Sequence, residues 1–301
     1  MTAASPLERA PESLAPGREL FLKREDVHET GAFKWRGALP ALRGYAAAGA
    51  TTVVTASTGN HGAAAAWAAR ELGLRAVVFV PEQASETKVA RIIALGAELH
   101  RGGADFDDAK ERAARHAAEH DQPFFEDGLE PAQYEGYHAI GEEILDQLGR
   151  APATVVVPLG NGALIGGVAE ALTGRATAVV AVVAKDAPVM ADSLETGSVA
   201  ESASGATIAD GLAVRVAIPY AVERIAPVID RVVRVSEREL AGAIGRLAAA
   251  GIRVEASAAA SLAALDHVDP SPGPVVLVLT GRNIDDGLFE RACSLPEAFP
   301  V

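Results

Sequence analysis

The sequence predicts an α/β protein with two lobes, each a mostly parallel twisted sheet flanked by helices. Short runs rich in β-branched residues alternate with alanine- and leucine-rich stretches of helical length. This is the pattern of parallel strands joined by crossover helices. The chain has 301 residues, of which 49% are hydrophobic, and this is enough for a large core divided between two lobes.

The first block of alternating segments is predicted to form a small inserted α/β domain, residues 50–128. We expect its strands at 51–55, 75–80, 97–100 and 123–126, and its helices at 61–72, 86–95 and 105–120. Gly73 and Gly96 follow the first two helices directly. Glycine at that position commonly ends a helix, because it adopts the left-handed conformation without strain.

The remaining segments, residues 1–49 and 129–301, are predicted to form the larger domain. We expect its strands at 154–157, 178–184 and 275–279, and its helices at 135–148, 163–172, 236–250 and 257–266. Ser236 and Glu239 have the spacing of a capping box, which opens the third of these helices. A further helix is expected after Lys34, where Pro40 predicts a kink or a late start.

The composition excludes several classes of function. A formal net charge of -13 argues against binding nucleic acid or an acidic membrane surface. The longest apolar run is too short to span a bilayer, and the start of the chain lacks the apolar stretch of a secretion signal. Cys293 is the single cysteine, so an internal disulfide and a cysteine-rich zinc site are excluded. The sequence therefore predicts a soluble, cytoplasmic protein.

Lys34 is the first candidate for chemistry. It has apolar neighbours, Phe33 and Trp35, and Gly31 permits a tight turn before it. Desolvation favours the neutral amine, and only the neutral amine attacks a carbonyl carbon. Taken by itself, the residue also fits a surface lysine at a helix start, which is the common situation for lysine.

Two glycine-rich turns, 57–62 and 160–162, come next. Each follows a predicted strand and precedes a predicted helix, where free backbone N–H groups can hold an anion. The alternative is an ordinary connection in which Thr58 or Asn60 caps the helix. The second turn lacks the third glycine and the downstream acid of a dinucleotide site, and no Walker lysine-serine pair is present. A phosphate without a nucleotide fits better.

Other polar residues carry weaker signals. An acidic residue stands beside small residues in Asp210-Gly211 and at Glu255. Considered alone, each of these segments is typical of a helix cap or a turn. His61 stands at a helix start and fits a structural role as well as a catalytic one. The remaining histidines show no metal-ligand spacing. Lys34 and the two turns together indicate an aldehyde cofactor with a phosphate, and a substrate with a carboxylate.

Taken in order, these segments resemble the fold type II family of pyridoxal-phosphate enzymes, and most of all its threonine/serine dehydratases and serine racemases. The resemblance extends from Leu22 to Asp285. It implies that pyridoxal 5'-phosphate forms a Schiff base with Lys34 and that Phe33 packs on its ring. The residues that it assigns to the cofactor are Phe33, Lys34, Asn60, Gly160, Asn161, Gly162, Ala163, Gly211, Glu255 and Thr280.

The same resemblance implies a site for a small amino-acid substrate. The residues that it assigns to the substrate are Ser57, Thr58, Gly59 and His61. Thr58 is expected to take part in catalysis near the face opposite Lys34. Thr280 would meet the ring nitrogen with a hydroxyl, which cannot stabilise a cationic ring as a carboxylate does. This favours elimination, so the implied enzyme is an ammonia-lyase. The resemblance also implies a homodimer.

Several departures from the dehydratase pattern leave alternatives open. Ala63 stands where these enzymes carry a glutamine, and the loop at 160–163 reads Gly-Asn-Gly-Ala, which is closer to threonine synthases. Ala184 and Met190 stand where the racemases have cation-binding acids. The alternatives are a β- or γ-replacement transferase of the threonine synthase or cysteine synthase kind, an amino-acid racemase, a catalytically silent binding protein and a nucleotide-binding domain.

Overall fold

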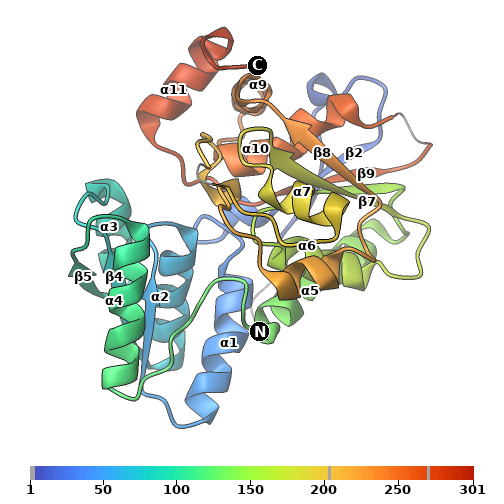
Figure 1. Ribbon diagram of the computed structural model, residues 1–301. Coiled ribbons are helices and arrows are strands. Elements are labelled where there is room, and N and C mark those ends of the chain that lie inside the picture. Colours follow the sequence, from blue (N-terminus) through green and yellow to red (C-terminus); the bar gives the residue numbers. More distant parts are fainter. Residues whose placement is uncertain (1–3, 203–204, 270–271) are drawn as a thin grey trace. The chain divides into compact units, whose positions relative to one another are not determined.

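Two separate β-sheets organise the chain (Figure 1). The computed structural model describes residues 4–202, 205–269 and 272–301. One unit comprises Met1–Ala32 and Tyr137–Val301, and the second comprises Phe33–Gly136. Residues 1–3, which the sequence assigned to the larger domain, lie outside the described part.

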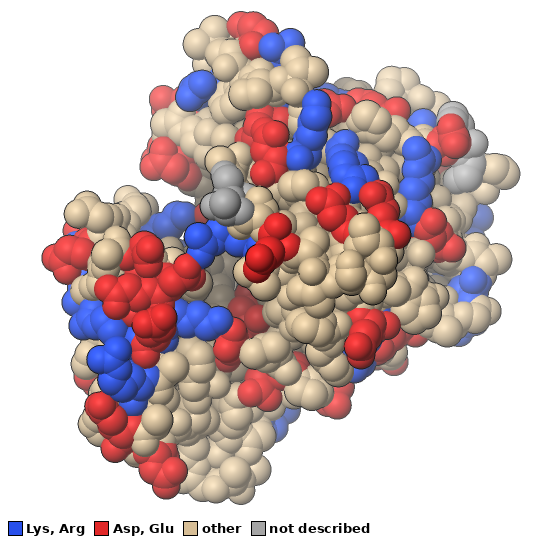
Figure 2. Space-filling view, viewed as in Figure 1, with Lys and Arg blue, Asp and Glu red and all other residues tan. Residues whose placement is uncertain are grey.

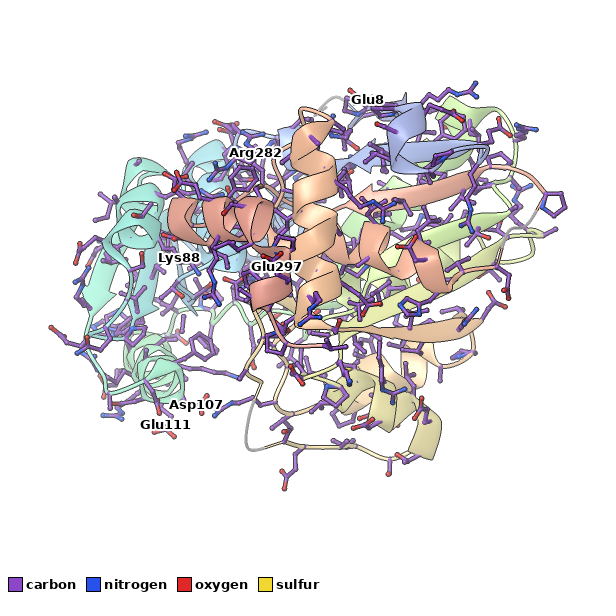
Figure 3. The ribbon with its side chains drawn as sticks, turned by 90° about the horizontal axis from the view of Figure 1, so that it is seen from above. Glu8, Lys88, Asp107, Glu111, Arg282 and Glu297 are labelled. Atoms are coloured by element: carbon purple, nitrogen blue, oxygen red, sulfur yellow. The ribbon has the colours of Figure 1, made fainter. Side chains whose placement is uncertain are left out.

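The second unit has a three-stranded parallel sheet in the order β3-β4-β5. Its strands are β3 (Thr52–Ala56), β4 (Arg75–Val80) and β5 (Glu98–Arg101), and its helices are α1 (Trp35–Ala47), α2 (Asn60–Leu72), α3 (Glu86–Ala94) and α4 (Phe106–Glu119). Helix α5 (Pro131–Leu148) begins in this unit and continues into the other. Asp107 and Glu111, which are labelled in Figure 3, lie one turn apart on α4.

The first unit has a six-stranded sheet in the order β1-β2-β9-β6-β7-β8. Its strands are β1 (Leu7–Arg9), β2 (Leu20–Arg24), β6 (Thr154–Pro158), β7 (Ala178–Ala184), β8 (Arg231–Val235) and β9 (Val275–Leu279). Its helices after α5 are α6 (Ala163–Ala171), α7 (Val189–Thr196), α8 (Pro219–Ile225), α9 (Glu237–Ala249), α10 (Ala256–Ala263) and α11 (Asp286–Ser294). Only β1 pairs antiparallel; the other pairs are parallel, so the predicted fold class is confirmed.

The central strands of this sheet are almost wholly apolar. β6 and β9 are buried along their full length, as expected where helices cover both faces of a parallel sheet. The two edge strands are different because both carry charge. Arg24 on β2 donates to Glu8 on β1 at 2.6 Å (Glu8 is labelled in Figure 3), and Arg234 on β8 donates to Asp192 on α7 at 2.9 Å.

Helix α1 runs through a proline. It begins at Trp35, which excludes the late start, and Pro40 lies inside it, so the other outcome expected there, a kink, stays a prediction. Pro40 has no N–H to offer the carbonyl of Arg36, four residues earlier. Gly136 on α5 comes close to that carbonyl: a Cβ built on Gly136 would lie 2.0 Å from the Arg36 oxygen. The absence of a side chain at Gly136 therefore lets α5 approach α1 at this point.

The second unit is larger than the inserted domain predicted at 50–128. It also takes in α1 and the start of α5. Trp35 on α1 meets Trp67 on α2 edge to face, with ring centroids 5.6 Å apart. The predicted boundaries missed this contact, because the two tryptophans lie on different segments and their pairing leaves no local pattern.

The predicted strand at 123–126 is wrong in extent. Only a single bridge, between Val54 and Phe124, is formed. Val54 exchanges two hydrogen bonds with this segment, accepting from the N–H of Phe125 and donating to the carbonyl of Pro123. Pro123 has no N–H with which to extend the ladder.

Candidate functional site

The segment that leads to Lys34 is fixed by a turn at Gly31. Gly31 has φ +64°, and a Cβ there would lie 2.3 Å from the Asn283 side chain, so only glycine fits without rearrangement. Ala32 forms a bridge with Gly281, and Arg282 donates its N–H to the Gly31 carbonyl at 2.9 Å. The loop after β9 therefore holds the residues that directly precede Lys34 in the chain.

Lys34 caps the N-terminus of α1 and its side chain is 15% exposed. Its amine lies 5.1 Å from the centre of the Phe33 ring. Its surroundings are not only apolar, because the amine donates to both carboxylate oxygens of Asp127, at 2.8 and 2.6 Å. Asp127 is 93 residues away in the sequence, so the pattern around Lys34 could not reveal it.

Asp127 is held from a second side by Gln133. The amide oxygen of Gln133 accepts the N–H of Gly128 at 2.8 Å and that of Glu130 at 3.4 Å. These two donors fix the orientation of the amide. The amide nitrogen is therefore directed to Asp127, where it donates to Oδ1 at 3.4 Å.

His61 lies in the first turn of α2 and is buried, 7% exposed, with its ring centre 4.5 Å from that of Phe125. Its Nε2 lies 3.1 Å from Thr55 Oγ1 and 3.2 Å from the Phe125 carbonyl, and its Nδ1 lies 3.5 Å from Asp127 Oδ1. Burial lowers the pKa of His61, while the charge of Asp127 raises it and that of Lys34 lowers it. The structure thus brings Lys34 and His61 to one carboxylate.

The turn at 57–62 joins β3 to α2, as predicted. Ser57 Oγ accepts the N–H of Gly59 at 3.1 Å, and a Cβ on Gly62 would lie 2.6 Å from the Ser57 carbonyl. Ser57, Thr58, Gly59 and Asn60 are all partly exposed, whereas His61 is buried. The first four are therefore accessible at the carboxyl end of a strand, where ligands bind in α/β proteins; the predicted contact of His61 with substrate remains a prediction.

In the first unit, the loop after β6 forms a close-fitting bend. Gly162 has φ +96° and caps α6. A Cβ on Gly160 would lie 2.5 Å from the Gly211 carbonyl. Asn161 Oδ1 accepts the N–H of Ala163 at 3.2 Å. The bend presents backbone N–H groups at the start of a nine-residue helix, an arrangement that suits an anion.

Further predicted residues gather around this bend and the end of β9. Gly211 donates its N–H to Ser257 Oγ at 3.0 Å. Glu255 donates its N–H to the Gly281 carbonyl at 3.0 Å, and a Cβ on Gly281 would lie 2.8 Å from the Glu255 carboxylate. Arg282, labelled in Figure 3, follows and donates to the carbonyl of Asp26.

Thr280 has the most unusual environment of these residues. It directly follows β9, is 2% exposed, and its hydroxyl has no hydrogen-bond partner among the described residues. A buried hydroxyl without a partner costs free energy, so such a group commonly awaits a ligand or an ordered water. A heteroaromatic nitrogen would satisfy it. The bend and Thr280 together fit a cofactor with an anionic group and a ring nitrogen.

Sequence reasoning missed three polar residues here. Asp127 had one available signal, since it follows a segment predicted to be a strand, and polar residues at such ends often face ligands. Gln133 and Ser257 had no distinguishing signal. Among the residues that the structure describes, no group of three or more His, Cys, Asp or Glu side chains is arranged to hold a metal ion.

Comparison with known proteins gives a consistent result. The sequence profile of the family described as pyridoxal-phosphate dependent enzyme matches residues 2–281. The L-threonine ammonia-lyase of Geobacter sulfurreducens is 36% identical over 275 residues, which is 89% of this chain and 68% of the relative. That of Thermotoga maritima is 33% identical over 280 residues, 91% of this chain and 70% of the relative.

Solved structures are similar over nearly the whole chain. The processed form of threonine deaminase isoform 2 from Solanum lycopersicum superposes with a TM-score of 0.91 at 27% identity. The match covers 96% of this chain and 87% of that one.

Proposed function

Because this chain belongs to the family of pyridoxal-phosphate-dependent enzymes, we propose that it is an ammonia-lyase acting on a β-hydroxy amino acid of the threonine or serine type. The products are a 2-keto acid and ammonia. The similarity to two bacterial L-threonine ammonia-lyases supports this reaction class. The family resemblance noted in the sequence is confirmed by the profile match.

The observation that carries the proposal is the buried hydroxyl of Thr280, which has no partner among the described residues. When bound, pyridoxal phosphate supplies an electron sink for charge that develops at the α-carbon of the substrate. We assign Thr280 to its ring nitrogen. A hydroxyl can donate to a neutral nitrogen but brings no negative charge to compensate a cationic one. The resulting weaker sink favours prompt loss of the β-hydroxyl.

The other cofactor contacts follow the same assignment. Gly160, Asn161, Gly162 and Ala163 would hold the phosphate through backbone N–H groups at the start of α6, where the helix dipole favours negative charge. Phe33 and Gly211 would pack on the ring, and Asn60 would hydrogen-bond its phenolic oxygen. Glu255, which donates its N–H to the Gly281 carbonyl beside Thr280, would also lie at the cofactor.

Lys34 has two tasks in this proposal. Its amine would be the group that holds the aldehyde of the cofactor, with loss of water, and once freed by the substrate it would be placed to accept the α-proton. The backbone N–H groups of the turn at 57–62, with Ser57, Thr58 and Gly59, hold the substrate carboxylate. Thr58 would take part in catalysis near the face opposite Lys34, and His61 would complete the substrate site.

We also propose that the enzyme works as a cytoplasmic homodimer. The resemblance to the family supports the dimer. The single cysteine is consistent with a reducing compartment. Within the described residues, no helix is both long enough and apolar enough to cross a bilayer.

The test begins with the purified protein loaded with pyridoxal phosphate. We expect L-threonine or L-serine to yield a 2-keto acid and ammonia in equal amounts. Lys34→Ala should lose this activity together with the visible absorbance band of the bound cofactor. Lys185→Ala, at an exposed lysine, is the matched control and should retain both.

The same assay separates the alternatives. If a thiol nucleophile suppresses keto-acid release and is itself incorporated, the enzyme is a β-replacement transferase. If the substrate only changes its handedness, it is a racemase. Full keto-acid release by Lys34→Ala would overturn the proposal.

A further inference from the structure

His61 has a proton-accepting nitrogen directed at the carboxylate that binds Lys34. Thr55 Oγ1 donates its single proton to the Phe125 carbonyl at 2.7 Å. His61 Nε2 lies 3.1 Å from that hydroxyl oxygen and 3.2 Å from the same carbonyl. Since neither oxygen has a proton to give, Nε2 must carry one and donate. In the neutral ring, Nδ1 is therefore a bare acceptor.

This acceptor faces another acceptor. His61 Nδ1 and Asp127 Oδ1 are 3.5 Å apart, and Asp127 in turn receives the Lys34 amine at 2.6 and 2.8 Å. Two acceptors side by side repel each other unless a proton lies between them. The geometry therefore provides a second position for a proton at Asp127 Oδ1, the oxygen that the Lys34 amine also contacts at 2.8 Å.

We propose that Asp127 and His61 form a proton store for Lys34: a proton that leaves the Lys34 amine passes by way of the Asp127 carboxylate to Nδ1 of His61. The proposal rests on the proposed function, in which the Lys34 amine must be neutral to bind the cofactor aldehyde and to take the α-proton. Asp127 contacts the reacting amine directly, and His61 acts through Asp127.

The transfer is balanced in atoms and charge. An N–H bond of the Lys34 ammonium breaks as an O–H bond forms on Asp127. That O–H bond then breaks as an N–H bond forms on His61 Nδ1. At the start the ion pair is Lys34 with Asp127, and at the end it is Asp127 with His61. The total charge of the three groups is unchanged, so no charge is left uncompensated in a largely buried place.

The charges around His61 favour its protonation only after Lys34 has lost its proton. The charged groups that face His61 are Asp127, Lys34 and Glu126. Burial lowers the pKa of His61, and the two carboxylates raise it while the Lys34 ammonium lowers it. When Lys34 becomes neutral its opposing charge disappears, and the ring becomes a better base at that moment.

The first test uses the full-length, cofactor-free protein with ¹⁵N-labelled histidine, followed by NMR across a pH titration. We expect wild-type His61 to show the Nε2–H tautomer. Lys34→Ala should raise its titration midpoint by about one pH unit, a tenfold change in proton affinity. In an Asp127→Asn background the same Lys34→Ala change should move the midpoint by less than half as much.

The second test follows the rate at which cofactor-free protein captures pyridoxal phosphate, read from the visible absorbance band. His61→Gln keeps a donor for the Phe125 carbonyl but cannot accept a proton. We expect it to capture the cofactor at least about tenfold more slowly near neutral pH. The defect should disappear as the pH rises, because hydroxide then removes the lysine proton. His138→Gln, at an exposed histidine of α5, is the control and should behave as wild type.

Three outcomes would overturn the store: an Nδ1–H tautomer in wild type, an undiminished Lys34→Ala shift in Asp127→Asn, or unaltered capture by His61→Gln. If His61→Gln fails to fold, the NMR comparison of wild type, Lys34→Ala and Asp127→Asn decides. Neither test needs turnover. If both tests give the expected results but the protein releases no keto acid, only the proposed activity is wrong. If the protein deaminates its substrate but His61→Gln captures the cofactor at the wild-type rate, only the proton store is wrong.

Discussion

At the scale of single residues, Thr280 and His61 are both buried, and each has a polar atom that could still gain a hydrogen-bond partner or a proton. The Thr280 hydroxyl has no hydrogen bond within the described residues. His61 is buried beside a carboxylate and an amine. Both environments depend on atoms that are distant in the sequence, which is why the sequence identified Thr280 only by resemblance and did not identify Asp127.

Thr280→Val should change two measurements in opposite directions. Removing an unsatisfied buried hydroxyl should raise the free energy of unfolding of the cofactor-free protein by about 1 kcal/mol. It should also weaken pyridoxal phosphate binding, because the partner of the ring nitrogen is lost. Chemical denaturation and a binding titration measure the two effects.

The matched control for this change is Thr177→Val. Thr177 Oγ1 donates to the Pro152 carbonyl at 2.8 Å, so its loss should lower the free energy of unfolding by about 1 kcal/mol. If both variants were destabilised alike, the assignment of Thr280 would be wrong.

His61 should make the stability of the cofactor-free protein depend on pH. Burial lowers the pKa of His61 in the folded protein, so below about pH 6.5 the unfolded chain binds a proton that the folded chain does not. The contribution is fully present above that pH and is lost as the pH falls toward the folded value. Urea denaturation at a series of pH values should show a shallower acid decline in His61→Gln than in wild type. An equal decline in both proteins would contradict this.

At the scale of elements, the strongly patterned segments were predicted well and the charged ones were not. β7 and β9 have the predicted bounds, and α9 begins with the predicted capping box, in which Ser236 accepts from the N–H of Glu239. β2 was missed because it contains Lys23, which no apolar pattern includes. Lys23 is fully buried, and its amine meets Glu143 on α5 at 2.5 Å. Glu143, which is 120 residues away in the sequence, compensates the charge of Lys23.

The contact between α1 and α5 makes a sharp prediction for glycine. Gly136→Ala should lower the free energy of unfolding by at least about 2 kcal/mol, since its Cβ would lie 2.0 Å from the Arg36 carbonyl. Gly44→Ala on α1 is the control: a Cβ there meets nothing within 4 Å, and alanine favours the helix by roughly 0.5–1 kcal/mol. Thermal and urea denaturation should therefore give shifts of opposite sign. If Gly136→Ala left the free energy of unfolding unchanged, α1 and α5 could move apart at little cost and this prediction would be wrong.

At the scale of the whole molecule, the two units of the structure have a boundary that differs from the one expected at residues 50–128. On the face drawn in Figure 2, acidic and basic side chains are intermingled and no broad basic area is present. This face is consistent with the net charge of -13. The boundary was missed because α1 joins the second unit through an aromatic pair.

The cofactor should stabilise the whole folded chain. Binding only to the folded state adds about 2.7 kcal/mol when the free cofactor is a hundredfold above its Kd. Calorimetry should show a higher thermal midpoint for the loaded protein than for the cofactor-free protein. Lys34→Ala should gain less, because it loses the covalent link. Equal midpoints with and without cofactor would show that the described residues do not hold it.

The charged edges of the six-stranded sheet limit how copies of the chain can assemble. β1 is three residues long, and β8, at the opposite edge, carries two arginines. Short strands with ionic side chains are poor templates for a neighbouring backbone. A dimer formed by continuing this sheet from one subunit into the next is therefore disfavoured. We expect subunits to join through helices or loops, and the same edges to resist fibrous aggregation when the protein is concentrated.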